Sequence, residues 1–139
     1  MQWFGKPPSE VDAARFKTEL AKGDVGTVFG HAGYLINLAG PEGSKLDKSM
    51  ESLIQEIEFA SLLKVPFLVL HPGAHLGQGE GEGIKRIASA LDLVFKATKK
   101  SSVRIALENT AGQGTCLGHQ IGHLSEIFNK VNHQDRLGI

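Results

Sequence analysis

The chain has 139 residues, which is enough for one domain with a substantial core. Its apolar fraction of 41% and charged fraction of 22% are typical of a globular protein, and no apolar run approaches the ~20 residues of a membrane span. Basic and acidic residues balance at 15 each, which disfavours a nonspecific nucleic-acid binder but leaves room for a local basic patch.

The single cysteine, Cys116, excludes an internal disulfide and is typical of a reducing compartment. No basic segment followed by an apolar one opens the chain, so we expect no secretory leader. These features predict a cytoplasmic protein that does not enter a membrane.

Helical patterns alternate with short apolar runs along the chain. Ser9 is a candidate N-cap, and the helix that follows it ends at Gly23. Further helical stripes are predicted over 44–63, from 84 onward and over 121–131, with strands at 25–29, 66–70, 103–107 and 136–139. The segment 77–83 is too rich in glycine to predict regular structure.

This alternation predicts an α/β fold of right-handed βαβ units with a parallel sheet, in one domain over 1–139. Two architectures fit: a small open doubly wound sheet, or about four βα units of a partial (β/α)8 TIM barrel, which normally needs ~250 residues. The chain begins in a predicted loop and ends in a predicted strand, so we expect it to form part of a larger fold.

Three predicted strands end in residues that can bind a metal. The apolar run 67–70 predicts a strand buried on both faces, and it ends in His71 before a Pro-Gly turn; His31 and Glu108 hold the same position in their strands. In barrels the carboxyl ends of the strands share one face, and imidazole and carboxylate are ordinary zinc ligands. A metal site is therefore a hypothesis, against the commoner alternative of hydrogen-bonded loop histidines and a paired carboxylate.

Three segments closely resemble endonuclease IV, the zinc-dependent apurinic/apyrimidinic endonuclease family with a xylose-isomerase-like TIM barrel. They are HAGYLINL at 31–38, LHPGAHLG at 70–77 and LENTAGQG at 107–114. The resemblance covers nearly the whole chain, whereas the chains of the family are much longer. It implies that His31 and His71 are each ligands of one Zn2+ ion and that Glu108 bridges that ion to a second Zn2+. All three residues are therefore implied to be catalytic.

The resemblance also implies a DNA partner. Tyr34 and Leu35 match residues that the family inserts into the minor groove at the lesion, although their pattern alone predicts core. Gln2 and Trp3 match the start of another DNA-contacting loop. The implied partner is double-stranded DNA with abasic sites.

The implied function is base excision repair by a hydrolase of the deoxyribonuclease IV type. Clustered zinc ions lower the pKa of a bound water, which attacks the phosphodiester 5′ to the abasic site. The family holds three zinc ions, and the protein ligands of only one are complete by residue 139. We therefore expect the chain alone to bind metal weakly and cut poorly, and its open sheet edge to favour self-association. Mn2+ is an alternative metal.

Two other functions compete with this one. A related barrel could carry a metal-dependent sugar isomerase or epimerase, or the chain could be an inactive, truncated binding module. Among the remaining histidines, the sequence predicts a loop role for His75 and a solvated surface position for His119, His123 and His133.

Overall fold

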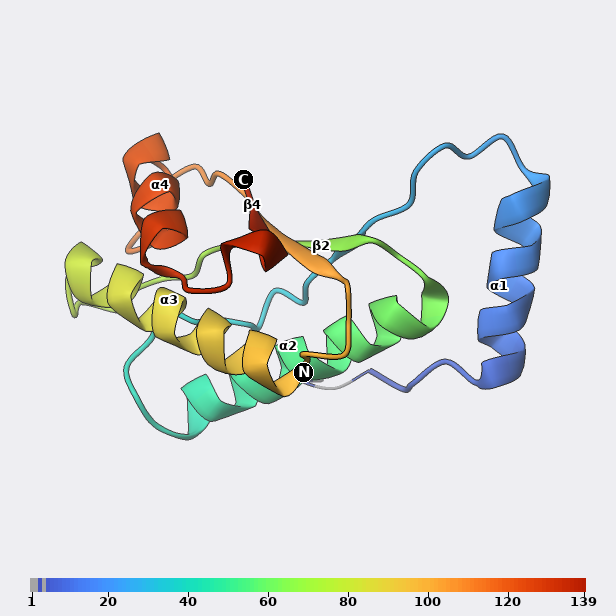
Figure 1. The fold of residues 1–139 in the computed structure, drawn as a ribbon. Helices are drawn as coiled ribbons and strands as arrows, with labels where there is room; N and C mark the ends of the chain where they lie inside the picture. Colours follow the sequence, from blue (N-terminus) through green and yellow to red (C-terminus); the bar gives the residue numbers. More distant parts are fainter. Residues whose placement is uncertain (1–2, 4) are drawn as a thin grey trace.

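The computed structural model describes residue 3 and residues 5–139. Helices and short strands alternate along the chain (Figure 1). In chain order they are α1 (Glu10–Lys22), β1 (Gly30–His31), α2 (Ser44–Leu63), β2 (Phe67–Leu70), α3 (Glu80–Ala97), β3 (Arg104–Leu107), α4 (Ile121–Lys130), a short 3-10 turn (Gln134–Arg136) and β4 (Leu137–Gly138). None of these helices is long and apolar enough to cross a membrane.

The four strands form one parallel sheet in the order β1-β2-β3-β4. Leu68 of β2 pairs in register with Ile105 of β3, which in turn pairs with Leu137 of β4. Because neighbours in sequence are neighbours in the sheet, the order is that of a barrel wall; a doubly wound sheet reverses its direction at a switch point. The partial TIM barrel prediction is confirmed.

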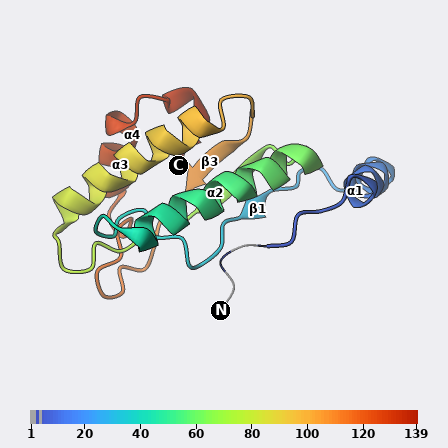
Figure 2. The ribbon, with the colours of Figure 1, turned by 90° about the horizontal axis from the view of Figure 1, so that it is seen from below.

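Helices α2 and α3 lie side by side along one face of the sheet (Figure 2). The strand residues that point toward them are buried, as are the facing stripes of both helices. The resulting apolar cluster includes Leu53, Ile57, Leu70, Leu91 and Ile105. Removal of these side chains from water supplies the main driving force for folding of the chain.

The opposite face of the sheet is open. Val69 and Ala106 are only half-buried there, and Phe29 and Ile139 are 57% and 63% exposed. Phe29 stacks on Phe67 with 5.6 Å between ring centroids, at the margin of a hollow of about 360 Å³. The prediction that β2 is buried on both faces is wrong for this structure, because the described residues cover only the helix side.

Two predicted boundaries also differ. The strand predicted over 25–29 is absent, and pairing begins only at Gly30. In this register residues 25–28 would lie opposite 63–66, where α2 ends and Pro66 has no amide hydrogen to donate. Helix α3 begins inside the glycine-rich segment, at Glu80. Gly83 suits that helix because a Cβ there would lie 2.8 Å from Leu117 Cδ1, so only glycine allows this close packing.

Replacing Ile105, which has no exposed surface, should be far more costly than replacing Val69 on the open face. We expect Ile105→Ala to lower the free energy of unfolding by about 2–5 kcal/mol and Val69→Ala by less than roughly 1 kcal/mol. Denaturant unfolding of both variants measures the difference. Equal losses would show that the open face is covered in solution, contrary to the structure.

Candidate metal centre

The structure brings the three strand-end residues together, and we call His31, His71 and Glu108 the strand-end centre. Glu108 Oε2 lies 2.8 Å from His31 Nε2 and 3.0 Å from His71 Nε2. The two imidazole rings are nearly perpendicular, with centroids 5.1 Å apart. One potential ligand atom from each residue lies within 4.8 Å of the others. Parallel strands in register therefore deliver three donors to one point.

Hydrogen bonds set the protonation behaviour of this centre. A bond between His31 Nδ1 and the Ala32 carbonyl, at 2.9 Å, raises the pKa of His31, and its bond to Glu108 adds to this effect. The pKa of Glu108 is lowered, chiefly by the same bond from His31. Because a carbonyl can only accept, Nδ1 of His31 carries a proton and Nε2 is the atom that faces Glu108.

The donor set fits a divalent metal. Two imidazole nitrogens and one carboxylate oxygen form a ligand set found in zinc sites with an open position. The side chains of His31, His71 and Glu108 are 48%, 56% and 40% exposed, which leaves room for further ligands. The carbonyl partner of His31 is also of the kind that orients metal-binding histidines.

The side chain of Asn37 holds the loops that carry the two histidines. Its Nδ2 donates to the Ala74 carbonyl at 2.9 Å, and its Oδ1 accepts from the Ala74 and Ala39 amides at 2.9 and 3.1 Å. Gly73 has φ +114°, and a Cβ there would overlap Asn37 Oδ1. Glycine at this position is thus required by both the backbone conformation and the close approach.

The loop after β2 is also tied to the loop after β3. The amide of His75 donates to the Thr115 carbonyl at 3.0 Å, and the amide of Leu117 donates to the Gly73 carbonyl at 2.8 Å. His75 has the predicted loop role, because its Nδ1 accepts the Gly79 amide at 3.0 Å, just before α3. The three loops at the strand ends therefore form one cross-linked surface.

The residues with implied DNA contacts lie at different levels of exposure. Tyr34 is 82% exposed, so its pattern-based assignment to the core is wrong, whereas Leu35 is partly buried. Trp3 is partly buried, and its carbonyl accepts a bond from Ser52 of α2 at 2.8 Å. Gln2 lies outside the described residues.

Glu56 supports the Tyr34 loop and was not identified from the sequence. Its carboxylate accepts the Gly33 amide at 3.1 and 3.2 Å from its two oxygens. Burial raises the pKa of Glu56, while this bond opposes the rise. A glutamate on the middle of an amphipathic helix gives no sequence signal for such a role, because the contact spans 23 residues.

One of the surface histidine predictions is wrong. His123 is only 7% exposed, and its Nε2 lies 3.4 Å from Glu80 Oε2 at the start of α3. The side chain of His133 is 44% exposed, as predicted, with Nδ1 3.0 Å from a carboxylate oxygen of Asp92. His119 is exposed as expected, but it lies close to His123 and Glu80 in a second group of potential ligands. The spacing of four between residues 119 and 123 was the available signal.

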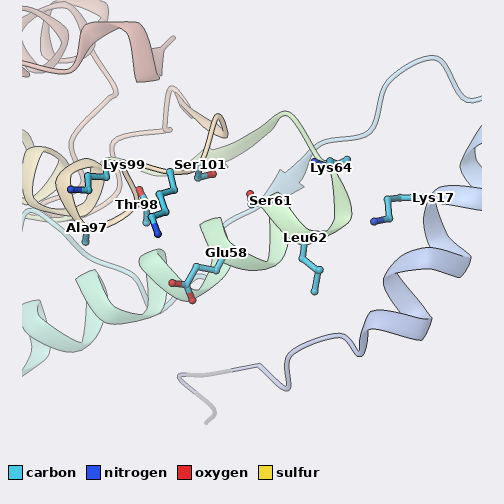
Figure 3. A pocket seen from close by; sticks show the side chains of 10 residues that line it. Lys17, Glu58, Ser61, Leu62, Lys64, Ala97, Thr98, Lys99 and Ser101 are labelled. Carbon is cyan, nitrogen blue, oxygen red and sulfur yellow. The ribbon is translucent and has the colours of Figure 1, made fainter.

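A hollow of about 630 Å³ lies near the amino ends of β2 and β3, beside the C-terminal ends of α2 and α3 (Figure 3). Its lining includes four lysines, Lys17, Lys64, Lys99 and Lys100, and one acidic residue, Glu58 on α2. Helix C-termini attract such side chains through the macrodipole. Since barrel chemistry is carried by the carboxyl ends of strands, this hollow is separate from the strand-end centre.

Removing the charge of Glu108 should lower the pKa of His31 in the metal-free protein. The raised pKa of His31 stabilises the fold below its ordinary value of 6.5, and this is lost as pH rises through the folded pKa. The lowered pKa of Glu108 stabilises above 4.5, and this is lost as pH falls through the folded pKa. Both contributions are therefore complete between 4.5 and 6.5.

We expect Glu108→Gln to reduce that stabilisation and to move the His31 titration, followed by NMR in the presence of chelator, toward 6.5, while the Ala32 bond keeps part of the rise in the pKa of His31. Glu126→Gln, on an exposed face of α4, is the control. A His31 titration unchanged in Glu108→Gln contradicts the ion pair.

Comparisons with known proteins agree with this arrangement. The family model described as "Xylose isomerase-like TIM barrel" matches residues 1–139. A "Probable endonuclease 4" of Nitratidesulfovibrio vulgaris is 46% identical over 138 residues, which are 99% of this chain and 49% of the relative. The corresponding protein of Chloroflexus aggregans is 41% identical, over 99% of this chain and 48% of the relative. The chain spans about half the length of these curated relatives.

Solved structures show the same fold. Endonuclease IV from Thermus thermophilus superposes with a TM-score of 0.72 at 26% identity, over 94% of this chain and 46% of that one. A D-tagatose 3-epimerase-like protein reaches a TM-score of 0.75 at 21% identity, over 94% and 50%, which is a likeness of fold alone. The chain belongs to the xylose isomerase-like TIM barrel family, in the group that contains the endonuclease 4 proteins.

Proposed function

We propose that this chain carries part of the active site of a metal-dependent DNA-repair endonuclease that cuts the phosphodiester 5′ to an abasic site. One observation carries the proposal: the Nε2 atoms of His31 and His71 converge on one carboxylate oxygen of Glu108 at the carboxyl ends of three adjacent strands. The relatives named endonuclease 4 support it.

Each residue of the strand-end centre has a distinct task in this proposal. His31 and His71 hold a divalent metal, zinc by resemblance, through their Nε2 atoms, and Glu108 holds it through its carboxylate. The bound metal would supply an activated water at neutral pH and offset charge on the phosphate. The bond that His31 Nδ1 donates to the Ala32 carbonyl keeps the ring oriented for this task. Manganese is the alternative metal, although a site with two imidazole nitrogens binds it more weakly than zinc.

We propose that the chain alone is weakly active or inactive. Three protein donors complete the ligands of one ion, while the resemblance implies a larger metal cluster. The open face of the sheet, with Phe29 and Ile139 exposed, is the surface that the rest of a barrel would cover. Without that cover, the apolar face and the free sheet edge favour self-association.

Exposed side chains beside the centre are proposed to contact DNA. Tyr34 projects into solvent from the loop after β1, which Glu56 holds through Gly33. Aromatic and aliphatic side chains in such loops can wedge between bases and unstack them, so Tyr34 and Leu35 are proposed as wedges. Gln2 and Trp3 are proposed to contact the same duplex. We place this activity in the cytoplasm.

A sugar epimerase is the less favoured alternative. The D-tagatose 3-epimerase-like structure shares the fold at 21% identity, which does not extend to chemistry. An inactive binding module remains as an outcome of the following experiment.

Joining this chain to the missing half of a relative should restore incision. In a chimera, the chain replaces the matching half of the Nitratidesulfovibrio vulgaris relative, and cutting of a duplex with one abasic site is measured with zinc. We expect cutting 5′ to the site, reduced on the order of 100-fold or more by Glu108→Ala because a metal ligand is lost. Glu126→Ala, which removes a carboxylate paired with Lys130 on α4, should cut normally.

The outcomes separate the three functions. A folded, zinc-binding chimera that leaves abasic DNA intact overturns the proposal, and its turnover of a ketose would favour the epimerase. With the chain alone, we expect cutting near background. Strong cutting by the chain alone that disappears in Glu108→Ala would overturn its proposed weakness and show that copies complete one another.

Tyr34→Ala should weaken binding to damaged DNA without affecting stability. The side chain is 82% exposed, so the melting temperature should not change. Loss of one aromatic contact with a base should weaken binding of the chimera to an abasic duplex about tenfold, with a smaller effect on undamaged duplex. Fluorescence anisotropy measures both, and Val11→Ala, at an exposed apolar position of α1, is the control. Unchanged affinity for the abasic duplex would exclude the wedge role.

A further inference from the structure

A second group of potential metal ligands lies between the first turn of α3 and the start of α4. We call Glu80, His119 and His123 the helix-end cluster. Glu80 is the first residue of α3, His119 precedes α4, and His123 lies in the first turn of α4. One donor atom of each lies within 4.8 Å of the others. This cluster shares no residue with the strand-end centre.

His119 is already in the tautomer that a metal needs. Its Nδ1 donates to the Cys116 carbonyl at 3.0 Å, so its Nε2 carries a lone pair. That Nε2 faces Glu80 Oε1 across 3.9 Å and accepts only a long contact of 3.3 Å from Gln120. The imidazole nitrogen of His119 and the carboxylate oxygen of Glu80 are both acceptors, and no strong hydrogen-bond donor lies between them. A cation placed between them would therefore be bound favourably.

His123 supplies a buried third donor. Its side chain is 8% exposed, and its Nε2 lies 3.4 Å from Glu80 Oε2. The Gly118 amide donates to its Nδ1 at 3.3 Å, so in the neutral, metal-free form Nε2 carries the proton on the side that faces Glu80. Metal binding requires this proton to move to Nδ1 and the Gly118 bond to break. The bond that is given up is long, since 3.3 Å is beyond the usual range of 2.7–3.2 Å, and the Gly118 amide must turn away from the new Nδ1–H because two N–H groups cannot bond each other.

The charges select the kind of metal. The N-terminal ends of α3 and α4 carry partial positive charge, which opposes a bare cation, and the carboxylate of Glu80 offsets it. Two imidazoles and one carboxylate suit zinc and related ions, whereas calcium and magnesium prefer sites built from oxygen. The two histidine rings cross at 88° with centroids 4.8 Å apart, so they approach one point from different directions.

We propose that Glu80, His119 and His123 form a second site for a zinc-class cation, which clips α3 to α4. The helix-end cluster is connected to the loop after β3, which follows Glu108, through Gly118. Gly118, which contacts His123, packs so closely that a Cβ there would lie 3.0 Å from Pro72 Cγ and 3.2 Å from the Glu108 carbonyl oxygen. A metal in the helix-end cluster therefore alters the support of both strand-end loops.

The test is a zinc titration of chelator-treated protein by calorimetry. The double variant His71→Ala/Glu108→Gln disables the strand-end centre, and the exposure of both side chains lets the fold persist. We expect this variant to bind one zinc per chain with a rise in melting temperature. Adding His119→Ala or Glu80→Gln should weaken that binding at least tenfold. His133→Asn, which keeps a donor toward Asp92 outside both clusters, should not.

Two further readouts guard against misfolding of the variants. The unmodified chain should bind zinc at two sites, and His119→Ala should leave one. Zinc should also shift the NMR resonance of the Gly118 amide in the double variant, because His123 exchanges that bond for the metal. Absence of zinc binding in the folded double variant, affinity unaffected by His119→Ala and Glu80→Gln, or zinc binding without a shift of Gly118 would each overturn the site.

Discussion

The amide side chain of Asn37 is the contact on which the strand-end centre depends. It satisfies one carbonyl and two amides from the loops after β1 and β2, and its Oδ1 occupies the space that any side chain at position 73 would need. Each such bond contributes about 1 kcal/mol, and leaving a buried partner unsatisfied costs about 1–3 kcal/mol. The contact also constrains geometry, because Asn37 Oδ1 packs directly against Gly73 and fixes the position of the turn that follows His71.

The sheet beneath those loops divides the molecule into two unequal faces. Leu70 and Ile105 pack against α2 and α3, whereas Val69 and Ala106 face a hollow. Most of the apolar burial therefore comes from the helix side. The histidines and Glu108 stand at the edge between the two faces, where backbone pairing fixes their spacing and solvent still reaches them.

Regular periodicity explains which parts of the fold could be predicted. The apolar stripe of α2 gives its bounds at both ends, and the Ser9 cap is found with the Asp12 amide bonded to its hydroxyl at 3.1 Å. Apolar runs locate β2 and β3, but a run says nothing about which face is covered. The strand expected over 25–29 failed because pairing depends on where the neighbouring strand begins.

The contacts around the site follow the same division. His31, His71 and Glu108 could be identified because each follows an apolar run, and the motifs around them resemble a family. Glu56 could not, because its partner Gly33 lies in a distant turn, and the His119–His123 spacing alone does not reveal their contact with Glu80 on another helix. Glycines were the least informative residues: Gly83 continues a helix because of tight packing that no local pattern encodes.

The cross-links among the loops have a consequence for change over evolutionary time or by design. Those between the loop backbones are made by Asn37 and by main-chain groups such as those of Gly73 and His75, whereas the imidazoles of His31 and His71 contact Glu108 across the strand ends. The donors can thus be exchanged while the frame that presents them stays intact. Different side chains at positions 31, 71 and 108 would therefore give this edge of the sheet another metal preference without a change of fold.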